Sequence, residues 1–408
     1  MKAVVLRAPG DVRVDDVPDP SILDPGDAIV AVSATAICGA DLFPFHGMTP
    51  GFEAGTVLGH EFAGEVVEIG ADVRRVRPGQ RVVNTSMISD GTCPACRAGR
   101  VTQCTGRSLF GYSGVYPRLD GGQAELVRVP LADRSLLPLP DEVSDEAAVF
   151  LADILPTGYG AVVRGGVQEG DTVVVVGCGP VGLMALLCAA GIAGTLIAVD
   201  GVPARLALAA SLGAEAVEPS RAVEVVAEAT GGTGADVVIE AAGSPGGLDA
   251  ALKLARGRGV VSVVGAHFEP DYPLDNALMF ERELTLRFSI GDPTADGALL
   301  LDRLAAGEPG TVQEAEGTYE SFFTDDDAML DFSRTAVELH RLVWAWRYTV
   351  PRGTLHGALA EVDGETVRVL ESSLVEVEGA TRVECADGPL WLVKTEPVSA
   401  ETPSTPPA

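Results

Sequence analysis

Short valine-rich segments separated by Gly, Pro and Asp make up most of the first 150 residues. Segments of this composition, bounded by turn-forming residues, are typical of β-strands. The expected strands are residues 3–6, 28–32, 64–69, 81–83 and 124–129. Residues 145–165 follow with an apolar pattern that favours a helix. The first part of the chain is therefore predicted to be mostly β.

From residue 172 the pattern changes to alternating strands and helices. The expected strands are 172–176, 195–199, 235–240 and 259–264, and the expected helices are 181–190, 203–212 and 248–254. This alternation is typical of a parallel, doubly wound sheet. The predicted fold class is therefore α/β, with a β-rich domain first and a doubly wound domain after it.

The pattern weakens from about residue 308, and the tail is predicted only in outline. Residues 314–330 are acidic and irregular, whereas 336–346 favour a helix. Residues 358–377 and 381–394 each suggest a hairpin, with Asp-Gly turns at 363–364 and 387–388. Residues 399–408 are rich in Pro, Ser and Thr, and we expect them to be disordered.

Composition excludes several classes of partner. The 408 residues carry a formal charge of −29, from 29 basic and 58 acidic side chains. So acidic a surface repels nucleic acid and anionic membranes, and otherwise indicates only solubility. The amino terminus does not read as a signal peptide, and no apolar run reaches a membrane span. We therefore expect a cytoplasmic protein. The charge says little about the substrate, and a small-molecule substrate is expected from the motifs in the chain.

Two groups of residues carry metal-ligand chemistry. Cys38, His60, Glu61 and Asp153 offer the ligand types that hold a catalytic zinc with one open position. Taken singly, Cys38 is better explained as a buried apolar residue and Asp153 as a helix cap, and only their occurrence together favours zinc. Three of the seven cysteines, Cys93, Cys96 and Cys104, lie close together, which favours metal binding over disulfides. The Cys93–Cys96 pair is also a redox spacing, but no thioredoxin-like pattern surrounds it.

A third motif indicates a dinucleotide. Four valines precede a Gly-x-Gly-x-x-Gly turn that opens an apolar helix. In this setting the glycines permit the turn, the approach of the pyrophosphate and close helix packing. The residues expected at the cofactor are Gly177, Gly179, Pro180, Val181 and Gly182.

Asp200 ends the next expected strand, 18 residues after Gly182. A carboxylate there accepts the ribose 2′-hydroxyl and repels a 2′-phosphate, which predicts NAD rather than NADP. Arg205, one helical turn further on, is expected to stack on the adenine, to pair with Asp200 or to lie in solvent.

At these residues the chain resembles the zinc-dependent medium-chain dehydrogenases, and most of all their glutathione-independent formaldehyde dehydrogenase-like branch. The matching segments are residues 37–42, 58–62, 110–112, 122–125, 153–159, 176–183 and 288–293. The resemblance covers residues 1–305 and implies a homodimer or homotetramer. It implies a GroES-like, partly open β-barrel with the zinc sites at 1–155, a Rossmann NAD-binding domain at 156–290, and a return toward the first domain at 291–340. We expect 341–398 to be a small β-rich extension.

The resemblance also implies roles for individual residues. Cys38, His60 and Asp153 become ligands of a catalytic zinc, and Glu61 is either a ligand in some states or a neighbour of the ligands. Four cysteines hold a structural zinc in relatives. Here the corresponding positions are Asp90, Cys93, Cys96 and Cys104, so the first thiolate is replaced by a carboxylate. Near the nicotinamide the resemblance places Thr157, Val264 and Gly265.

Two positions depart from the family pattern. Many relatives carry Ser or Thr two residues after Cys38, and His three residues later, to relay the alcohol proton. This chain has Ala40 and Phe43 there, neither of which can do so. His46 lies nearby and is a weaker catalytic candidate. Three hypotheses follow: an alcohol or aldehyde oxidoreductase, a reductase of an activated C=C or C=N bond, and a non-catalytic NAD-binding regulatory protein.

Overall fold

The computed structural model describes residues 1–267, 272–306, 358–362, 365–373, 380–385 and 388–397. These residues belong to two compact units, Met1–Gly317 and Thr318–Ala408. The expected helix at 336–346, the irregular segment at 314–330 and the terminal residues 399–408 lie outside the described residues.

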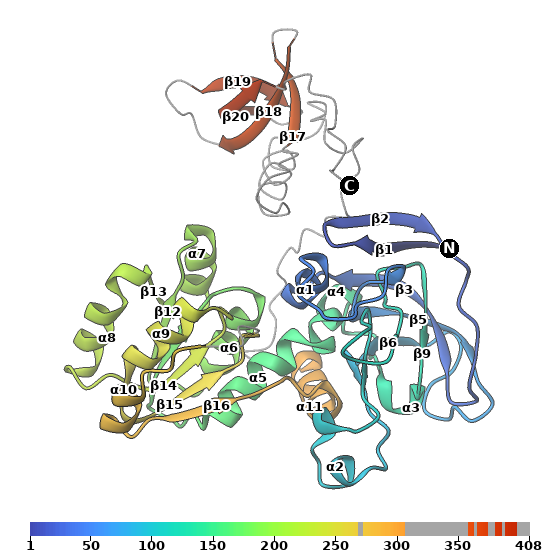
Figure 1. Ribbon diagram of the computed structural model, residues 1–408, viewed down its shortest axis with the longest axis horizontal. Helices are drawn as coiled ribbons and strands as arrows, with labels where there is room; N and C mark the ends of the chain where they lie inside the picture. Colours follow the sequence, from blue (N-terminus) through green and yellow to red (C-terminus); the bar gives the residue numbers. More distant parts are fainter. Residues whose placement is uncertain (268–271, 307–357, 363–364, 374–379, 386–387, 398–408) are drawn as a thin grey trace. The chain divides into compact units, whose positions relative to one another are not determined.

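The first half of Met1–Gly317 is an antiparallel barrel-like domain (Figure 1). One sheet has the order β2-β1-β4 and the other the order β10-β6-β5-β3-β9. The strands are β1 (Lys2–Ala8), β2 (Asp11–Asp16), β3 (Ala28–Ala36), β4 (Thr56–Val57), β5 (Glu61–Ile69), β6 (Arg81–Asn84), β9 (Leu126–Val129) and β10 (Leu136–Pro138). The short elements are α1 (Leu42–Phe45), β7 (Met87–Ile88), α2 (Pro94–Arg97), β8 (Ser108–Leu109) and α3 (Ala132–Ser135).

The five strands predicted in this domain are confirmed, with longer bounds for most of them. Strand β2 was not predicted, because its sequence, DVRVDD, is dominated by charges. It pairs with β1 along its length and is held there by surface ion pairs, Lys2–Asp16 at 2.8 Å and Arg7–Asp15 at 2.7 Å. Apolar packing elsewhere centres on Phe62 and Phe110, whose rings meet edge to face with centroids 5.2 Å apart.

Residues 145–165 are helical as predicted, but they do not form one continuous helix. The chain instead forms α4 (Asp145–Ala148), a 3-10 turn at Val149–Ala152 and α5 (Ile154–Gly165). The break falls at Asp153, whose backbone (φ −151°, ψ −64°) is not helical. Within the described residues no single helix is long and apolar enough to cross a membrane. The segments on either side of Asp153 meet that criterion only as a pair, and they are bent by 49°.

The second half of this unit is a six-stranded parallel sheet in the order β13-β12-β11-β14-β15-β16. Its strands are β11 (Thr172–Val176), β12 (Thr195–Val199), β13 (Glu215–Val217), β14 (Ala235–Glu240), β15 (Ala255–Val263) and β16 (Thr285–Phe288). Its helices are α6 (Pro180–Ala189), α7 (Pro203–Ser211), α8 (Ala222–Thr230), α9 (Pro245–Leu254) and α10 (Asn276–Glu281).

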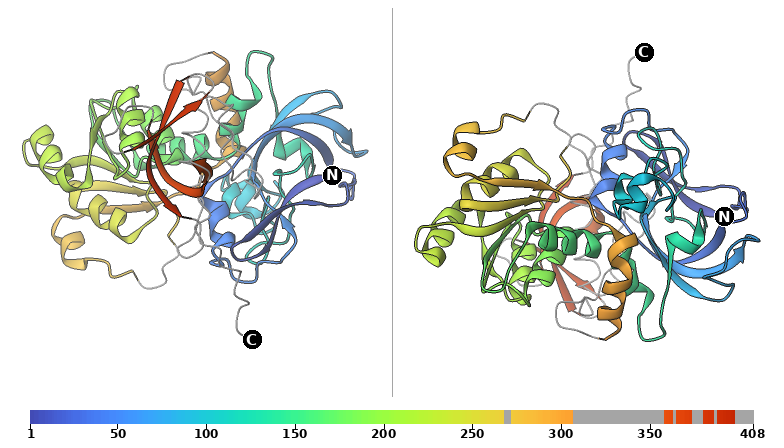
Figure 2. Two further views of the ribbon diagram at one scale, coloured as in Figure 1. Left: turned by 90° about the horizontal axis from the view of Figure 1, so that it is seen from above. Right: turned by 90° about the horizontal axis from the view of Figure 1, so that it is seen from below.

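Helices lie on both faces of this sheet (Figures 1 and 2). The side chains of β11 alternate between two apolar clusters: Val174 and Val176 belong to the cluster containing α8 and α9, whereas Val173 and Val175 belong to the cluster containing α5 and α6. The valine run therefore supplies both faces of a buried strand, as expected for a parallel sheet.

Helix α11 (Pro293–Ala305) leads the chain back toward the first domain. Asp292 caps it by accepting a hydrogen bond from the N–H of Ala295 at 3.0 Å. Leu300 is buried against Leu151 and Leu155, which flank the break at Asp153. Helix α11 therefore packs against the segment around Asp153, and the return expected over residues 291–340 stays a prediction.

The unit Thr318–Ala408 contains a four-stranded antiparallel sheet in the order β17-β18-β20-β19. Strands β17 (Ala358–Val362) and β18 (Glu365–Ser373) pair, as do β19 (Thr381–Cys385) and β20 (Gly388–Pro397). These pairs match the two predicted hairpins. Of the two predicted turns, only Gly388 is a described residue.

Candidate active site and cofactor crevice

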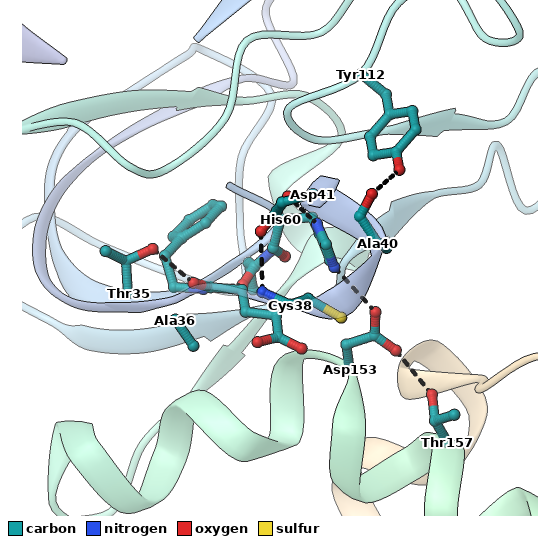
Figure 3. A network of polar contacts seen from close by, with 12 residues as sticks. Thr35, Ala36, Cys38, Ala40, Asp41, His60, Tyr112, Asp153 and Thr157 are labelled. Atoms are coloured by element: carbon teal, nitrogen blue, oxygen red, sulfur yellow. Dashed lines mark hydrogen bonds and ion pairs between the residues drawn. The ribbon is translucent and has the colours of Figure 1, made fainter. Parts of the chain in front are cut away.

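Four predicted metal ligands converge at one place in the barrel domain (Figure 3). Cys38 precedes a 3-10 turn at Gly39–Asp41, His60 and Glu61 lie at the start of β5, and Asp153 occupies the break before α5. One ligand atom from each lies within 4.8 Å of all the others. The helix break is what turns Asp153 toward the barrel.

The imidazole of His60 is held between two carboxyl groups. Its Nδ1 lies 3.1 Å from Oδ1 of Asp41, and its Nε2 lies 3.3 Å from Oδ2 of Asp153. Asp41 is itself fixed, because its Oδ2 accepts from the N–H of Cys38 at 2.9 Å and from the amide of Gln123 at 3.4 Å. Sequence reasoning missed Asp41 and Gln123 as orienting residues, although both lie in matched segments.

Burial and charge perturb all three groups at the centre. Burial raises the pKa of Cys38 to about 12 and that of Glu61 to about 8. Burial alone lowers the pKa of His60, but the negative charge of Asp41, the nearby carboxyl group of Asp153 and the hydrogen bond to Asp41 outweigh it, so that the pKa lies well above its ordinary value. Three groups with raised pKa values therefore lie together at this centre.

The donor set fits a divalent metal. Glu61 Oε1 is buried without a hydrogen-bond partner, and His60 Nε2 is buried 3.3 Å from Asp153 Oδ2 without making a hydrogen bond to it. Orphaned buried polar atoms are costly, and a coordinated cation satisfies them. A mixture of thiolate, imidazole and carboxylate, close together and with Asp41 orienting the imidazole, suits zinc.

The residues around Cys38 bear on proton transfer. Ala40 contributes its carbonyl oxygen, which accepts a hydrogen bond from the hydroxyl of Tyr112. Tyr112 also packs edge-on against His60 with ring centroids 6.4 Å apart, a contact that the sequence did not reveal. His46 is exposed at the end of α1, with its ring 5.2 Å from that of Phe45, and it does not belong to the cluster.

The second predicted group also assembles. Asp90, Cys93, Cys96 and Cys104 bring their ligand atoms within 4.8 Å of one another. Oδ1 of Asp90 accepts from the N–H of Cys93 at 2.8 Å, and Cys104 Sγ accepts from the N–H of Asp90 at 3.4 Å. Backbone hydrogen bonds, that from Cys96 foremost, lower the pKa of Cys93 to about 7. The carboxylate at the first position is therefore compatible with a closed four-ligand site.

The glycine-rich turn has the predicted form. Gly177 has φ +93°, and a Cβ there would lie 2.6 Å from the nitrogen of Ala242. A Cβ on Gly182 would lie 1.8 Å from the oxygen of Gly177. Gly179 precedes Pro180 and Val181 at the start of α6, has no side-chain cap and has open space around it. Unpaired N–H groups at a helix start favour an anion there.

Asp200 lies next to this turn. Its Oδ2 accepts from the N–H of Cys178 at 2.7 Å and its Oδ1 from the N–H of Val202 at 2.8 Å. Arg205 Nη1 is 3.7 Å from Asp200 Oδ2, so of the expected alternatives the structure has the pairing. Asp200 thus joins the end of β12 to the glycine-rich turn.

The residues expected at the nicotinamide lie on two separate elements. The hydroxyl of Thr157, one turn into α5, donates to Oδ1 of Asp153 at 2.7 Å. The N–H groups of Val264 and Gly265 both donate to the carbonyl of Glu240, each at 2.9 Å. Sequence reasoning did not single out Glu240.

A barrel domain with a buried thiolate, imidazole and carboxylate cluster, joined to a doubly wound domain, defines a metal-dependent dehydrogenase. Comparison with known proteins agrees. The family model for the alcohol dehydrogenase GroES-like domain matches residues 24–141, and that for zinc-binding dehydrogenases matches residues 180–306.

Two relatives show how far the similarity extends. The chain is 41% identical over 278 residues to a medium chain reductase/dehydrogenase of an Acremonium species, covering 65% of this chain and 94% of that protein. It is 40% identical over 309 residues to a probable zinc-binding alcohol dehydrogenase of Mycobacterium tuberculosis, covering 75% and 79%. The chain therefore belongs to the zinc-type medium-chain alcohol dehydrogenase family of oxidoreductases.

Solved structures confirm the predicted fold class. An alcohol dehydrogenase from Thermus sp. ATN1 matches with a TM-score of 0.72 and 38% identity, covering 76% of this chain and 91% of that one. A zinc-binding dehydrogenase of Sinorhizobium meliloti bound to NADP matches at TM-score 0.66 and 33% identity, covering 74% and 89%. An Escherichia coli alcohol dehydrogenase in complex with NADH matches at 0.65 and 28%, covering 75% and 88%.

Proposed function

We propose that this chain is a zinc-dependent oxidoreductase that transfers hydride between NAD(H) and an alcohol or aldehyde. The observation that carries the proposal is the cluster of Cys38, His60, Glu61 and Asp153, in which two buried polar atoms, His60 Nε2 and Glu61 Oε1, make no hydrogen bond. These four residues would hold zinc, which would polarise a substrate C–O bond, and the glycine-rich turn would bind NAD, which would accept or supply the hydride. In this proposal residues 1–155 carry the metal chemistry and residues 156–290 carry the cofactor.

The protein's own residues divide the work. Cys38, His60 and Asp153 supply sulfur, nitrogen and oxygen ligands, and Glu61 lies against them as an alternative ligand. Asp41 keeps Nε2 of His60 facing the cluster by holding Nδ1. Thr157 binds one oxygen of Asp153, which leaves the other directed toward His60. The metal site is therefore supported from both the barrel and α5.

The choice of NAD over NADP rests on Asp200. Its carboxyl group lies at the end of β12 beside the glycine-rich turn, where a ribose 2′-hydroxyl finds an acceptor and a 2′-phosphate meets negative charge. Arg205 is already directed toward Asp200. This arrangement supports NAD as the cofactor of the proposed enzyme.

Zinc content tests the proposal directly. Protein purified without chelator is expected to hold about two zinc ions per chain, one for each four-residue group. Asp90→Ala should lower the content to about one without loss of NAD-linked activity, because the second group has no part in the chemistry. The measurement is metal analysis, followed by a screen of alcohols and aldehydes with NAD.

The control is Asp72→Ala, which removes a surface carboxylate and should leave both ions in place. Folded protein that binds NAD but contains no zinc would contradict the proposal.

We further propose the formaldehyde dehydrogenase-like branch on the resemblance of residues 153–159 and 288–293. The screen therefore begins with formaldehyde, without added glutathione, and no activity on it would remove the branch assignment.

The runner-up function is reduction of an activated C=C or C=N bond, and Ala40 and Phe43 favour it. Protonation in such a reaction does not require the relay that alcohol oxidation uses. If the lead proposal is right, the double variant Ala40→Ser, Phe43→His should raise the alcohol oxidation rate by roughly tenfold or more, because a positioned proton acceptor contributes at least that much. Steady-state kinetics measure this, with Ala40→Ser alone as the control. An unchanged rate would favour the runner-up.

A further inference from the structure

A buried carboxyl group that the proposed chemistry does not use lies at the end of β14, opposite the last residue of the strand that leads into the glycine-rich turn. Glu240 is the last residue of β14, and it is fully buried. Its Oε1 accepts hydrogen bonds from the N–H groups of Ala242 at 3.0 Å and Gly243 at 2.9 Å. Its Oε2 lies 2.9 Å from Nε2 of His267. Glutamate is rarely buried to this extent unless it is paired, and here both carboxyl oxygens have hydrogen-bond partners.

The same residue also uses its backbone to join neighbouring segments. Its carbonyl oxygen accepts from the N–H groups of Val264 and Gly265, which follow β15. The next residue, Ala241, donates to the carbonyl of Val176 at the end of β11. Backbone hydrogen bonds at Glu240 and Ala241 therefore connect the ends of three adjacent strands, β11, β14 and β15.

The two segments that Glu240 joins are in direct contact. A Cβ on Gly265 would lie 2.3 Å from the nitrogen of Gly243 and 2.7 Å from Oε2 of Glu240. Gly243 has φ +59°, and a Cβ there would lie 2.9 Å from the oxygen of Ala266. Because the backbones meet without side chains between them, a shift of the Glu240–His267 pair moves both segments.

These contacts lie where a doubly wound sheet binds its ligand. The chain runs from β11 outward to β13 in one direction and from β14 outward to β16 in the other, so the order reverses between β11 and β14. Ligands of such sheets bind outside the carboxyl ends of the strands at this reversal. Glu240 is the carboxyl-terminal residue of a strand that borders it.

We propose that Glu240 and His267 form a positioning pair for the cofactor, holding residues 241–243 and 264–266 in the shape that receives the nicotinamide end of NAD. The inference rests on the NAD site of the proposed function. The pair acts through the two segments and takes no part in hydride or proton transfer. Its loss therefore weakens cofactor binding and leaves the turnover of the saturated enzyme largely unchanged.

The test compares NADH dissociation constants, measured by fluorescence titration of the full chain, together with thermal unfolding. His267→Leu removes the partner of Oε2 and should weaken NADH binding about tenfold. His267→Gln, whose amide can donate to the same oxygen, should stay within about threefold of the wild type. Glu240→Gln keeps an acceptor for the N–H groups of Ala242 and Gly243 and should also weaken NADH binding. It provides a second test of the pair if His267→Leu does not fold.

The matched control lies at the opposite edge of the same two strands. Asp236 in β14 pairs with Arg256 in β15 at 2.7 Å, near their amino ends. Asp236→Asn should lower the unfolding temperature without changing the NADH dissociation constant. The KM for NAD should rise in the His267 and Glu240 variants while kcat is kept, a split that a purely structural role does not produce.

The outcomes distinguish a failure of NADH binding as such from a failure of the Glu240–His267 pair to affect it. Wild-type protein that does not bind NADH overturns the proposed function and this inference with it. Wild-type binding that His267→Leu and Glu240→Gln leave unchanged overturns the inference alone. Equal weakening by Asp236→Asn and His267→Leu also overturns it, because the pair would then contribute only general stability.

Discussion

Replacing Cys38 with alanine is expected to reduce kcat/KM for alcohol oxidation by about 1000-fold or more. The variant removes the only sulfur from the cluster with His60, Glu61 and Asp153, and a bound metal supplies several kcal/mol of stabilisation to the developing charge on oxygen. The measurements are steady-state kinetics with NAD and zinc content per chain. The content should fall by about one ion.

Cys188→Ala is the matched control, because Cys188 packs with the apolar residues of α6 and belongs to neither metal group. It should keep the zinc content and most of the activity. If Cys38→Ala retained full zinc and near wild-type kcat/KM, the cluster could not be the catalytic centre. A far-UV circular dichroism spectrum that matches the wild type in both variants would separate loss of metal from loss of fold.

The second large effect is expected from Gly182→Ala. The added Cβ would lie 1.8 Å from the carbonyl oxygen of Gly177, so the glycine-rich turn must move away from α6. We expect NADH affinity to fall by more than about 100-fold, since the backbone that approaches the pyrophosphate is displaced. The free energy of unfolding should also drop, by about 1–3 kcal/mol. Calorimetric titration and chemical denaturation measure the two effects.

Two other glycines separate these effects. Gly179 has open space around it and an ordinary negative φ, so Gly179→Ala should leave stability unchanged while its methyl group obstructs the cofactor. Gly191 also has open space, lies outside the turn, and Gly191→Ala should change neither quantity. Unaltered NADH affinity in both Gly182→Ala and Gly179→Ala would be incompatible with a dinucleotide at this turn.

The elements that sequence reasoning found are those buried on a regular apolar pattern. Strand β11 is an example. Its four valines pack alternately into two apolar clusters, which is the arrangement that an uninterrupted valine run predicts for a central parallel strand. Strands β2 and β16 escaped because their side chains are mostly exposed or partly exposed, so no periodic pattern marks them. The break at Asp153 also escaped, although Pro156 lies in the first turn of α5, where proline is tolerated because it follows a helix start.

The candidate site divides in the same way. The metal ligands and the glycine-rich turn could be predicted because each is identified by residue type and spacing within a short segment. The orienting residues could not, because their partnerships join distant segments. Gln123 reaches Asp41 across 82 positions, and His267 reaches Glu240 across 27. Nothing in either local sequence indicates the partner.

Helix α5 has a consequence for how the two sites influence each other. Asp153 precedes its first residue and belongs to the metal cluster, while Gly158, one turn later, lies so close to α6 that a Cβ would be 2.6 Å from the nitrogen of Ala185. Helix α5 therefore connects a proposed metal ligand to α6, the helix that begins at the glycine-rich turn. If a bound cofactor changes the affinity for the metal through α5, then a bound metal must change the affinity for the cofactor by the same factor, because such coupling is reciprocal.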